Sequence, residues 1–198
     1  MKALPWGQKV NKEKEAKLML KKMRGFTLIE LLIVVAIIGI LAALLIPNAL
    51  SAIQKAKQKG TMKDINSIST AIVDFVTDNG TAPSGVTGPL STGSNLYTAL
   101  SGFYLKVLPQ NDQWGTPFYV WTGTAAENAY TGVTNCGFDD FVVASIGRDK
   151  AVTAISFNPL TPSTAYFDIT GMTSFNQDLV NWSGSWIHAP KSAQLGTT

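Results

Sequence analysis

The sequence has few of the residues from which catalytic centres are built. Its 198 residues include one histidine, His188, and one cysteine, Cys136. A lone histidine without a Gly-x-Ser-x-Gly segment gives no basis for a serine hydrolase, and neither a Walker A segment nor a cysteine–histidine zinc pattern occurs. A single cysteine also excludes an intrachain disulfide. We therefore predict that the protein is not an enzyme and that no covalent cross-link ties its loops.

Charged residues are also scarce, at 15% of the chain, and they are unevenly placed. The first 25 residues hold eight basic and two acidic residues, a net charge of +6, whereas the rest holds eight basic and eleven acidic residues, a net charge of −3. A chain that is acidic beyond its first 25 residues is poorly suited to phosphate-backbone binding. No nucleic-acid partner is predicted.

One long apolar run covers residues 26–46 and contains a single charged residue, Glu30. As a helix these residues measure about 31 Å, which matches the hydrocarbon thickness of a bilayer. The basic cluster Lys21, Lys22 and Arg24 predicts that residues 1–25 stay in the cytoplasm and that everything after the run lies outside it. Hydropathy alone favours an uncleaved signal anchor, but a carboxylate at membrane depth is costly unless it has a partner.

The segment GFTLIELLIVVAIIGILAALLIPN, residues 25–48, resembles the processing signature of type IV pilins and of the type II secretion pseudopilins. The matching positions are Gly25, Phe26, Thr27, Glu30 and Pro47. The resemblance implies that a prepilin peptidase cuts after Gly25 on the cytoplasmic face and methylates the new amino group of Phe26. A leader of 25 residues is long for a pilin that begins with phenylalanine, which leaves the subclass open.

The same resemblance implies a role for Glu30 in assembly, together with Thr27. In these families the carboxylate meets the N-terminal amine, here that of Phe26, on a neighbouring subunit as it leaves the membrane. A paired buried charge costs much less than an unpaired one, so Glu30 would favour docking in the correct register. The alternative is that Glu30 only extends toward the lipid headgroups.

An amphipathic pattern continues beyond the apolar run over residues 47–80, with Ile65, Ile68 and Ile72 at three- and four-residue spacing. Residues 26–79 would form a helix of about 80 Å, too long for a compact domain. Gly39 and Pro47 weaken this helix locally. The family resemblance implies that the segment can lose helical order in a filament; a simple bend at Pro47 is the alternative.

Residues 81–198 are rich in turn formers and contain several strand-like runs. They begin with a loop-rich stretch that has a short helix around residues 96–100. Four runs, PFYVWTG, FDDFVVASIG, AVTAISF and TAYFDIT, are rich in aromatic and β-branched residues. We predict an α+β fold in which a long N-terminal helix, half transmembrane and half packed on the head, carries a small antiparallel β-sheet head domain.

Two short patches of the head also resemble the major pseudopilins. NDQWGTPFYVW is similar to their Asp-Pro-Trp-Gly segment, with Gln113 where proline is usual. FVVASIGRDK and NQDLVNW are similar to their calcium-binding loop, although the intervening insertion is longer here. The resemblance implies a Ca²⁺ ion held by Asp149 and Asp178, the carbonyl of Ile146 and Asn176. Carboxylate and carbonyl oxygens suit this cation; solvated loop carboxylates are the alternative.

The sequence therefore predicts a structural subunit of a type IV pilus that forms a homopolymeric helical filament. The expected partners are a prepilin peptidase, the inner-membrane assembly machinery and, for the monomer, the membrane itself. The single-pass precursor would lie in the inner membrane with its head outside the cytoplasm, and the product would be an extracellular pilus. A first alternative is a major pseudopilin of a type II secretion system, which builds a periplasmic filament. A second is a signal-anchored periplasmic binding module that never polymerises.

Overall fold

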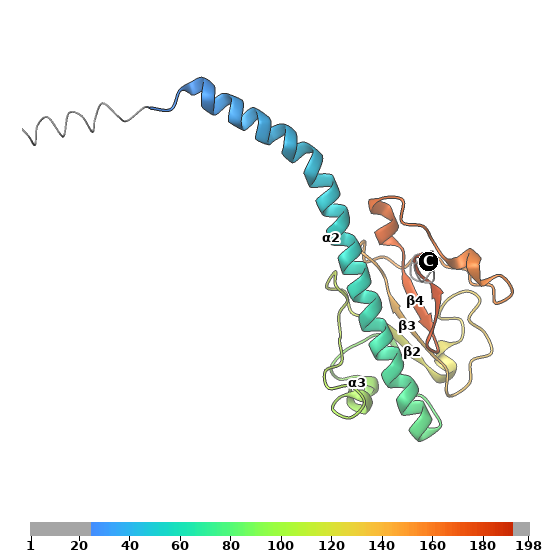
Figure 1. Ribbon diagram of the computed structural model, residues 1–198. Helices are drawn as coiled ribbons and strands as arrows, with labels where there is room; N and C mark the ends of the chain where they lie inside the picture. Colours follow the sequence, from blue (N-terminus) through green and yellow to red (C-terminus); the bar gives the residue numbers. More distant parts are fainter. Residues whose placement is uncertain (1–24, 192–198) are drawn as a thin grey trace, which may run out of the picture. The chain divides into compact units, whose positions relative to one another are not determined.

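A computed structural model describes residues 25–191 of the chain (Figure 1). The first described element is a long helix, α2 (Leu28–Asn79), and a small antiparallel sheet follows it in sequence. The predicted α+β fold is therefore confirmed. The predicted leader lies outside the described residues, apart from Gly25, as does the end of the chain after Lys191.

The chain divides into two compact units, Met1–Asn48 and Ala49–Thr198. In the first unit the described residues from Leu28 onward are helical, and the helix continues through Gly39 and Pro47. The large apolar side chains between Phe26 and Ile46 are between 45% and 88% exposed. The helix contains a stretch of mean hydropathy 3.1, none of it buried, which is long and apolar enough to cross a membrane.

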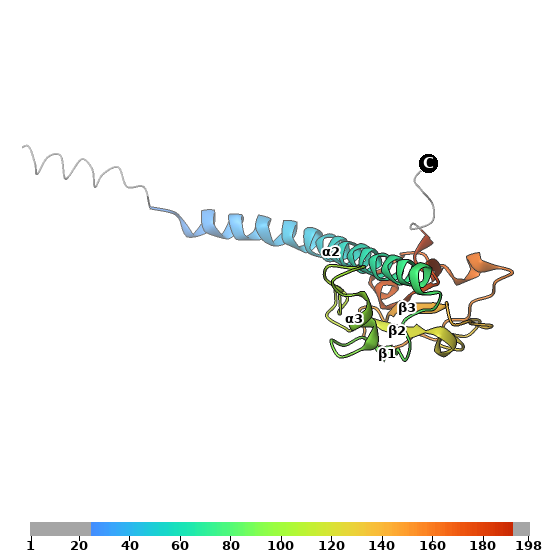
Figure 2. The same ribbon diagram turned by 90° about the horizontal axis from the view of Figure 1, so that it is seen from below.

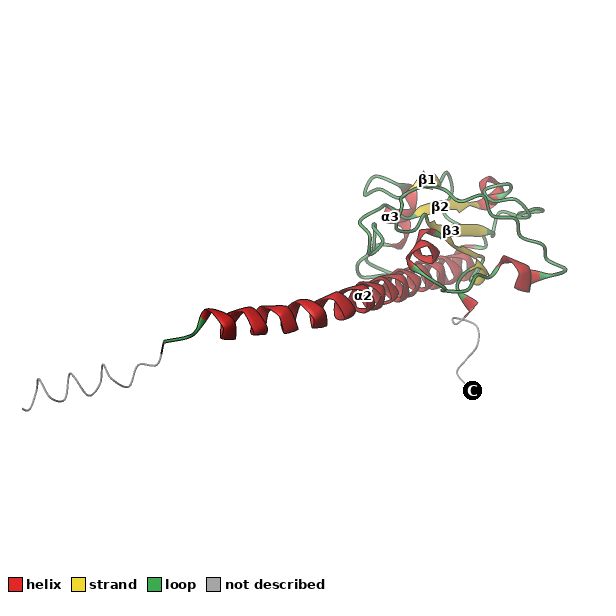
Figure 3. Ribbon diagram, turned by 90° about the horizontal axis from the view of Figure 1, so that it is seen from above, coloured by secondary structure: helices red, strands yellow, loops and turns green. Residues whose placement is uncertain are grey.

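The second unit contains one five-stranded sheet in the order β1-β2-β3-β4-β5, with every neighbouring pair antiparallel. The strands are β1 (Thr87–Pro89), β2 (Tyr119–Thr122), β3 (Phe141–Ser145), β4 (Leu179–Trp182) and β5 (Ser185–His188). In the central strand, Val143 lies opposite Val120 of β2 and Asn181 of β4. Figure 3 shows the strands in yellow beside the C-terminal part of α2.

The C-terminal part of α2 packs its apolar face on one side of this sheet (Figure 2). Ile65, Ile68 and Ile72 are 0% exposed and belong to one core with Phe118, Val120, Phe141, Val143 and Leu179. The three- and four-residue spacing of the isoleucines places them on one stripe of the helix, as the sequence predicts. A buried hydrogen bond from Ser69 Oγ to Asn181 Oδ1 (3.1 Å) joins α2 to β4.

Loops cover the opposite face of the sheet and form a second core. Val142 and Ala144 of β3 contribute to it, with Val180 of β4 and Ile187 of β5. The segments outside the sheet add Ala126, Tyr130, Val133, Cys136 and Ile155. Because successive side chains of a strand point to opposite faces, β3 lies between two cores. All five of its residues are buried, which explains its uninterrupted apolar sequence.

Two of the four predicted strand runs are wrong. AVTAISF contributes only an isolated bridge between Thr131 and Ser156, and TAYFDIT begins inside the 3₁₀ helix η2 (Pro162–Ala165) and adds a bridge between Phe167 and Pro190. Their apolar residues are used in packing, since Ile155 belongs to the second core. The last two strands lie instead at β4 and β5, in stretches that the prediction left without strands.

A tight hairpin joins β4 to β5. Its two turn residues, Ser183 and Gly184, have φ values of 45° and 87°. Positive φ at both central residues is the type I′ geometry that suits the twist of a hairpin, and the Ser-Gly pair was the available sequence signal. The predicted short helix is confirmed as α3 (Asn95–Leu100), whose N-cap Ser94 accepts a hydrogen bond from the Tyr97 N–H (3.3 Å).

Candidate functional site

The predicted assembly residues form a capping box at the start of α2. The Thr27 N–H and hydroxyl both donate to Glu30 Oε2, at 2.9 and 2.7 Å, and the Glu30 N–H donates to Thr27 Oγ1 at 3.2 Å. This reciprocal arrangement satisfies backbone donors that the first turn of a helix leaves free. The Thr-x-x-Glu spacing was a readable signal for it. Thr27 and Glu30 are therefore brought together, and Glu30 has a partner within its own chain.

The residues predicted for processing lie before α2, and those predicted to weaken the helix lie inside it. Gly25 and Phe26 are exposed and precede α2, outside any helix or strand, and the Phe26 side chain is 76% exposed. Gly39 and Pro47 both lie within the helix. Proline has no N–H, so the Ala43 carbonyl lacks its usual helical donor. Cleavage after Gly25 and a loss of helical order near these two residues stay predictions.

The loop with the NDQWG sequence fastens the head to α2. Asp112 is buried: its Oδ1 accepts the N–H groups of Trp114 and Thr116, both at 2.9 Å, and its Oδ2 accepts the Ser145 hydroxyl at 2.7 Å. The indole N–H of Trp114 donates to Gln54 Oε1 on α2 at 2.8 Å. This patch therefore has a structural role.

Gln113 adds two further bonds from this loop to α2. Its N–H donates to Thr61 Oγ1 (3.2 Å) and its side-chain amide to Asp64 Oδ2 (2.9 Å). A proline at this position would lack both donors. Gly60 makes room for the side chain, because a Cβ there would lie 3.0 Å from Gln113 Cγ.

The candidate metal residues come together at one end of the sheet. Ile146 is buried directly after β3, and Asp149 follows on an exposed turn. Asn176 ends the 3₁₀ helix η3 (Met172–Asn176), and Asp178 immediately precedes β4. The backbone approaches closely here, since a Cβ on Gly147 (φ 71°) would lie 2.9 Å from the carbonyl oxygens of Asn176 and Gln177.

Asp178 is the most unusual of these residues because its carboxyl group is 0% exposed and has no cationic partner within residues 25–191. It accepts the Thr153 N–H at 3.2 Å on each oxygen and the Tyr130 hydroxyl at 3.1 Å. Burial raises its pKa to about 6, and the charge of Asp149 adds to the rise. Burial likewise raises the pKa of the Tyr130 hydroxyl, so that Tyr130 remains a donor at neutral pH.

The other predicted ligands are less available. The Asn176 side-chain oxygen accepts Arg148 Nε at 3.0 Å, and Asp149 Oδ1 accepts the Ala151 N–H at 3.2 Å. No group of three or more histidine, cysteine, aspartate or glutamate side chains suited to a metal occurs among the described residues. Two carboxylates with neighbouring carbonyl groups are the chemistry that Ca²⁺ prefers, so the donor set fits this ion better than a transition metal.

The residues that sequence reasoning set aside as non-catalytic are buried. His188 lies on β5 rather than in a tail, its Nδ1 is 2.6 Å from the Asp178 carbonyl oxygen, and burial lowers its pKa. Cys136 belongs to the second core, and burial, followed by the charges of Asp140 and Glu127, raises the pKa of its thiol to about 11. Both groups are therefore neutral at pH 7.

Comparison with known protein families identifies both parts of the chain. Residues 20–46 match the model of the prokaryotic N-terminal methylation motif, and residues 48–153, just over half of the chain, match the model of type II secretion system protein G. The chain belongs to the protein G family of type II secretion systems. The predicted resemblance to pilins and pseudopilins is thereby confirmed, and the pseudopilin alternative is favoured over the type IV pilus.

Individual relatives agree with this family. The chain is 36% identical over 105 residues to type II secretion system core protein G of Aeromonas hydrophila, which covers 50% of this chain and 72% of the relative. It is 38% identical over 112 residues to that of Pseudomonas aeruginosa (52% and 78%). A longer match, 24% identical over 176 residues, joins it to that of Dickeya chrysanthemi (85% and 92%). No solved structure matches the chain.

Proposed function

We propose that this protein is a pseudopilin, the structural subunit of a periplasmic filament in a type II secretion system. One observation carries the proposal: an apolar stretch of helix, none of it buried and with a carboxylate at its start, precedes a head of the protein G family. Apolar surface of this extent requires lipid or other subunits around it. The subunit would be cut after Gly25, methylated on Phe26 and held in the inner membrane until it polymerises.

The test is complementation in a type II secretion host that lacks its own protein G. The proposal predicts restored secretion and short filaments whose subunits begin with N-methylated Phe26 by mass spectrometry. Long surface pili without restored secretion would favour the type IV pilus instead. A membrane-bound protein that retains residues 1–25 and forms no filaments would favour the non-polymerising module and contradict both filament functions.

We also propose that Asp149 and Asp178 hold a Ca²⁺ ion, with carbonyl groups around Ile146 and Asn176 completing its coordination. The support is the buried Asp178 carboxylate, which has no cationic partner among the described residues. An ion would join the loop after β3 to the start of β4, which no disulfide can do here. At a hundredfold excess over its dissociation constant it would stabilise the head by about 2.7 kcal/mol.

Calorimetry of the processed chain in detergent tests the calcium proposal. Calcium should raise the melting temperature of the wild type but not that of a variant with Asp149→Asn and Asp178→Asn, and magnesium should have a weaker effect. Asp139→Asn is a matched control, because it removes an exposed carboxylate outside the candidate site. An unchanged melting temperature of the wild type across millimolar calcium would contradict the proposal.

A further inference from the structure

Three exposed lysines of α2 form a row of like charges within the second unit. Lys55, Lys59 and Lys63 are spaced four residues apart. Side chains at this spacing share a helix face, so their ammonium groups repel one another. The one ion pair within residues 25–191 joins Lys191 to Asp168, so none of the three is neutralised there. We call these three residues the lysine stripe.

Further along the same helix, two exposed aspartates repeat this arrangement with the opposite sign. Asp74 and Asp78 are also four residues apart, and neither has a cationic partner among the described residues. The Tyr104 hydroxyl donates to Asp78 Oδ2 at 2.9 Å, which holds one carboxylate in place without neutralising it. We call these two residues the aspartate pair.

The lysine stripe and the aspartate pair cannot meet within one chain, but their spacing allows two copies to join them. Nineteen residues separate Lys55 from Asp74 and Lys59 from Asp78, which is about 28 Å along a helix. Two parallel copies displaced by that length would therefore bring two ammonium groups to two carboxylates at once. A displacement of fifteen residues, about 22 Å, matches Lys59 and Lys63 to the same pair.

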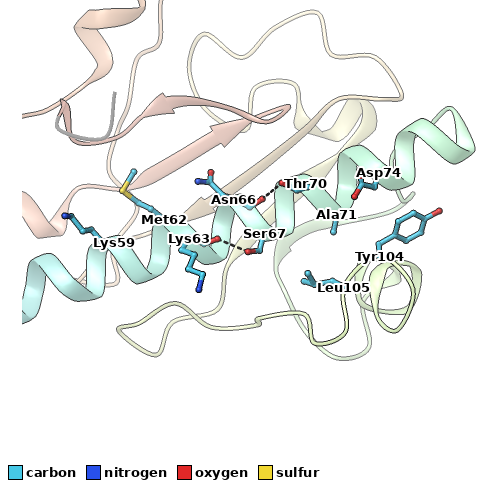
Figure 4. Close-up of a pocket in the computed structure, with 10 residues that line it drawn as sticks. All are labelled: Lys59, Met62, Lys63, Asn66, Ser67, Thr70, Ala71, Asp74, Tyr104 and Leu105. Atoms are coloured by element: carbon cyan, nitrogen blue, oxygen red, sulfur yellow. Dashed lines mark hydrogen bonds between the residues drawn. The ribbon is translucent and has the colours of Figure 1, made fainter. Parts of the chain in front are cut away.

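The surface between the two charged groups is hollow. A groove of about 600 Å³ runs along α2, and Lys59, Lys63 and Asp74 are among the residues that line it (Figure 4). Met62 and Ala71, which are 9% and 1% exposed, also line it, with Leu105 from the facing loop. Because Met62 and Ala71 are buried and Leu105 is partly buried, the surface that a neighbouring copy would meet in the groove is mainly that of the charged residues along its edge.

We propose that the lysine stripe of one copy binds the aspartate pair of the next copy in a parallel, staggered contact. The two surfaces are different and lie at different heights on the helix, so the contact is heterologous and leaves a free surface of each kind at the two ends. Such a contact propagates into a filament. The inference rests on the proposed function and adds to it the head surfaces that set the axial step.

A second copy explains both charged groups, whereas an anionic membrane surface explains only one. Lipid headgroups would attract the lysine stripe but would repel the aspartate pair. Equal spacing of opposite charges on a single helix is the property expected of surfaces that bind each other. We therefore expect the contact to weaken at high salt.

Charge reversal in the full chain, scored by the amount of subunit in sheared filaments, tests this contact. The first variant carries Lys55→Glu and Lys59→Glu, the second carries Asp74→Lys and Asp78→Lys, and a third carries all four changes. Each of the first two should lose filaments about tenfold. The third should recover to within about threefold of wild type if the displacement is nineteen residues; for a displacement of fifteen, the rescuing lysine changes are Lys59→Glu and Lys63→Glu. A control with Lys57→Glu and Lys106→Glu changes the net charge as much as the first variant but spares the lysine stripe.

The change at Asp78 could disturb folding, because it removes the acceptor of the Tyr104 hydroxyl. Asp74→Lys alone avoids this problem, since Asp74 makes no side-chain hydrogen bond among the described residues. It should reduce filaments less than the double change. Lys55→Glu should then restore them if the displacement is nineteen residues, and Lys59→Glu should restore them if it is fifteen. Filament loss from the lysine changes alone, with no effect of the aspartate changes and no rescue, would assign the stripe to a membrane surface and overturn the proposal. Wild-type amounts from all variants would also overturn it.

Cysteine cross-linking in filaments distinguishes a displacement of nineteen residues from one of fifteen. A Lys59→Cys chain mixed with an Asp78→Cys chain should form a disulfide dimer if the step is nineteen residues, and Lys59→Cys with Asp74→Cys if it is fifteen. Single variants control for Cys136, which is buried. Failure of both pairs in intact filaments would overturn the contact, whereas an absence of filaments from the wild type would overturn the proposed function instead.

Discussion

The two halves of α2 are built from similar apolar residues but use them in opposite ways. Before Asn48 the large apolar side chains surround the helix and are exposed, as Ile38 is at 58%. After Ala49 the buried apolar side chains occupy one face, and Ile65 and Ile68 are 0% exposed against the sheet. A helix that is apolar all round needs surroundings from outside the chain, whereas one with a single apolar face completes its core within it. The first half is therefore suited to assembly and the second to folding.

The largest expected effect comes from a substitution that prevents cleavage between the first half of α2 and residues 1–25. Gly25→Leu should block processing completely, because a bulky side chain would replace the small residue at the predicted cleavage position. Mass spectrometry of the membrane protein should then find residues 1–25 retained, while Gly39→Leu, which is in the same apolar half, should be processed. Normal mature protein from Gly25→Leu would contradict the assignment of the cleavage site.

The same substitution in the two halves should separate folding from assembly. Ile68→Ala should lower the free energy of unfolding of the head by about 2–5 kcal/mol, because it opens a cavity in a closed core. Ile38→Ala should change it by less than about 0.5 kcal/mol, because that side chain contacts no core. Tryptophan fluorescence during urea unfolding measures this, since all four tryptophans of the processed chain lie in the head. Equal effects would contradict the division of the helix.

The head should also show a pH dependence that the first half lacks. The pKa of Asp178 is raised from 3.8 to about 6 by burial, so the folded state binds its proton more tightly than the unfolded state. Its contribution to stability is therefore fully present below about pH 4 and is lost as the pH rises through 6. In a metal chelator, unfolding of wild type between pH 4 and 6 should show this fall, and Asp178→Asn should remove it. Identical pH profiles would contradict the burial of an ionisable Asp178.

The smallest expected effect concerns the loop that fastens the head to α2. Gln113→Pro should destabilise the head by about 1–2 kcal/mol, because it removes the donors to Thr61 and Asp64. Gln113→Ala should cost less, since it keeps the backbone bond to Thr61. Urea unfolding of the two variants provides the comparison, and a proline variant as stable as the alanine variant would show that the Thr61 bond contributes nothing.

The sequence predicted best those parts of the molecule that are governed by local patterns. The first half of α2 follows from the length of its apolar run and the second from its three- and four-residue periodicity. The Thr27–Glu30 capping box follows from a spacing of three residues, although only a role between subunits was predicted for these two residues. The strands β4 and β5 were missed because most of their residues are buried, so that no alternation marks them. The runs around Ile155 and Phe167 were predicted as strands because loop packing selects the same residue types as a sheet.

The candidate metal site was also predicted only in part. The family resemblance predicted that Asp149 and Asp178 share a site, and in the structure the adjacency of β3 and β4 brings the two residues to one end of the sheet. The pairing of Asn176 with Arg148 and the complete burial of Asp178 depend on the insertion between the two strands. No local pattern in the sequence describes such long-range packing.

We expect that the first half of α2 mediates polymerisation and that the charge of Glu30 directs this step. Glu30→Gln tests it most directly, because glutamine keeps an oxygen that can cap Thr27 but carries no charge to meet the amine of a neighbouring Phe26. Thr27→Val is the matched control, since it weakens the cap and keeps the charge. The measurement is the ratio of subunit in sheared filaments to processed subunit in the inner membrane. We predict that Glu30→Gln is processed normally and accumulates in the membrane with few or no filaments, while Thr27→Val still assembles; a wild-type ratio from Glu30→Gln would contradict the claim.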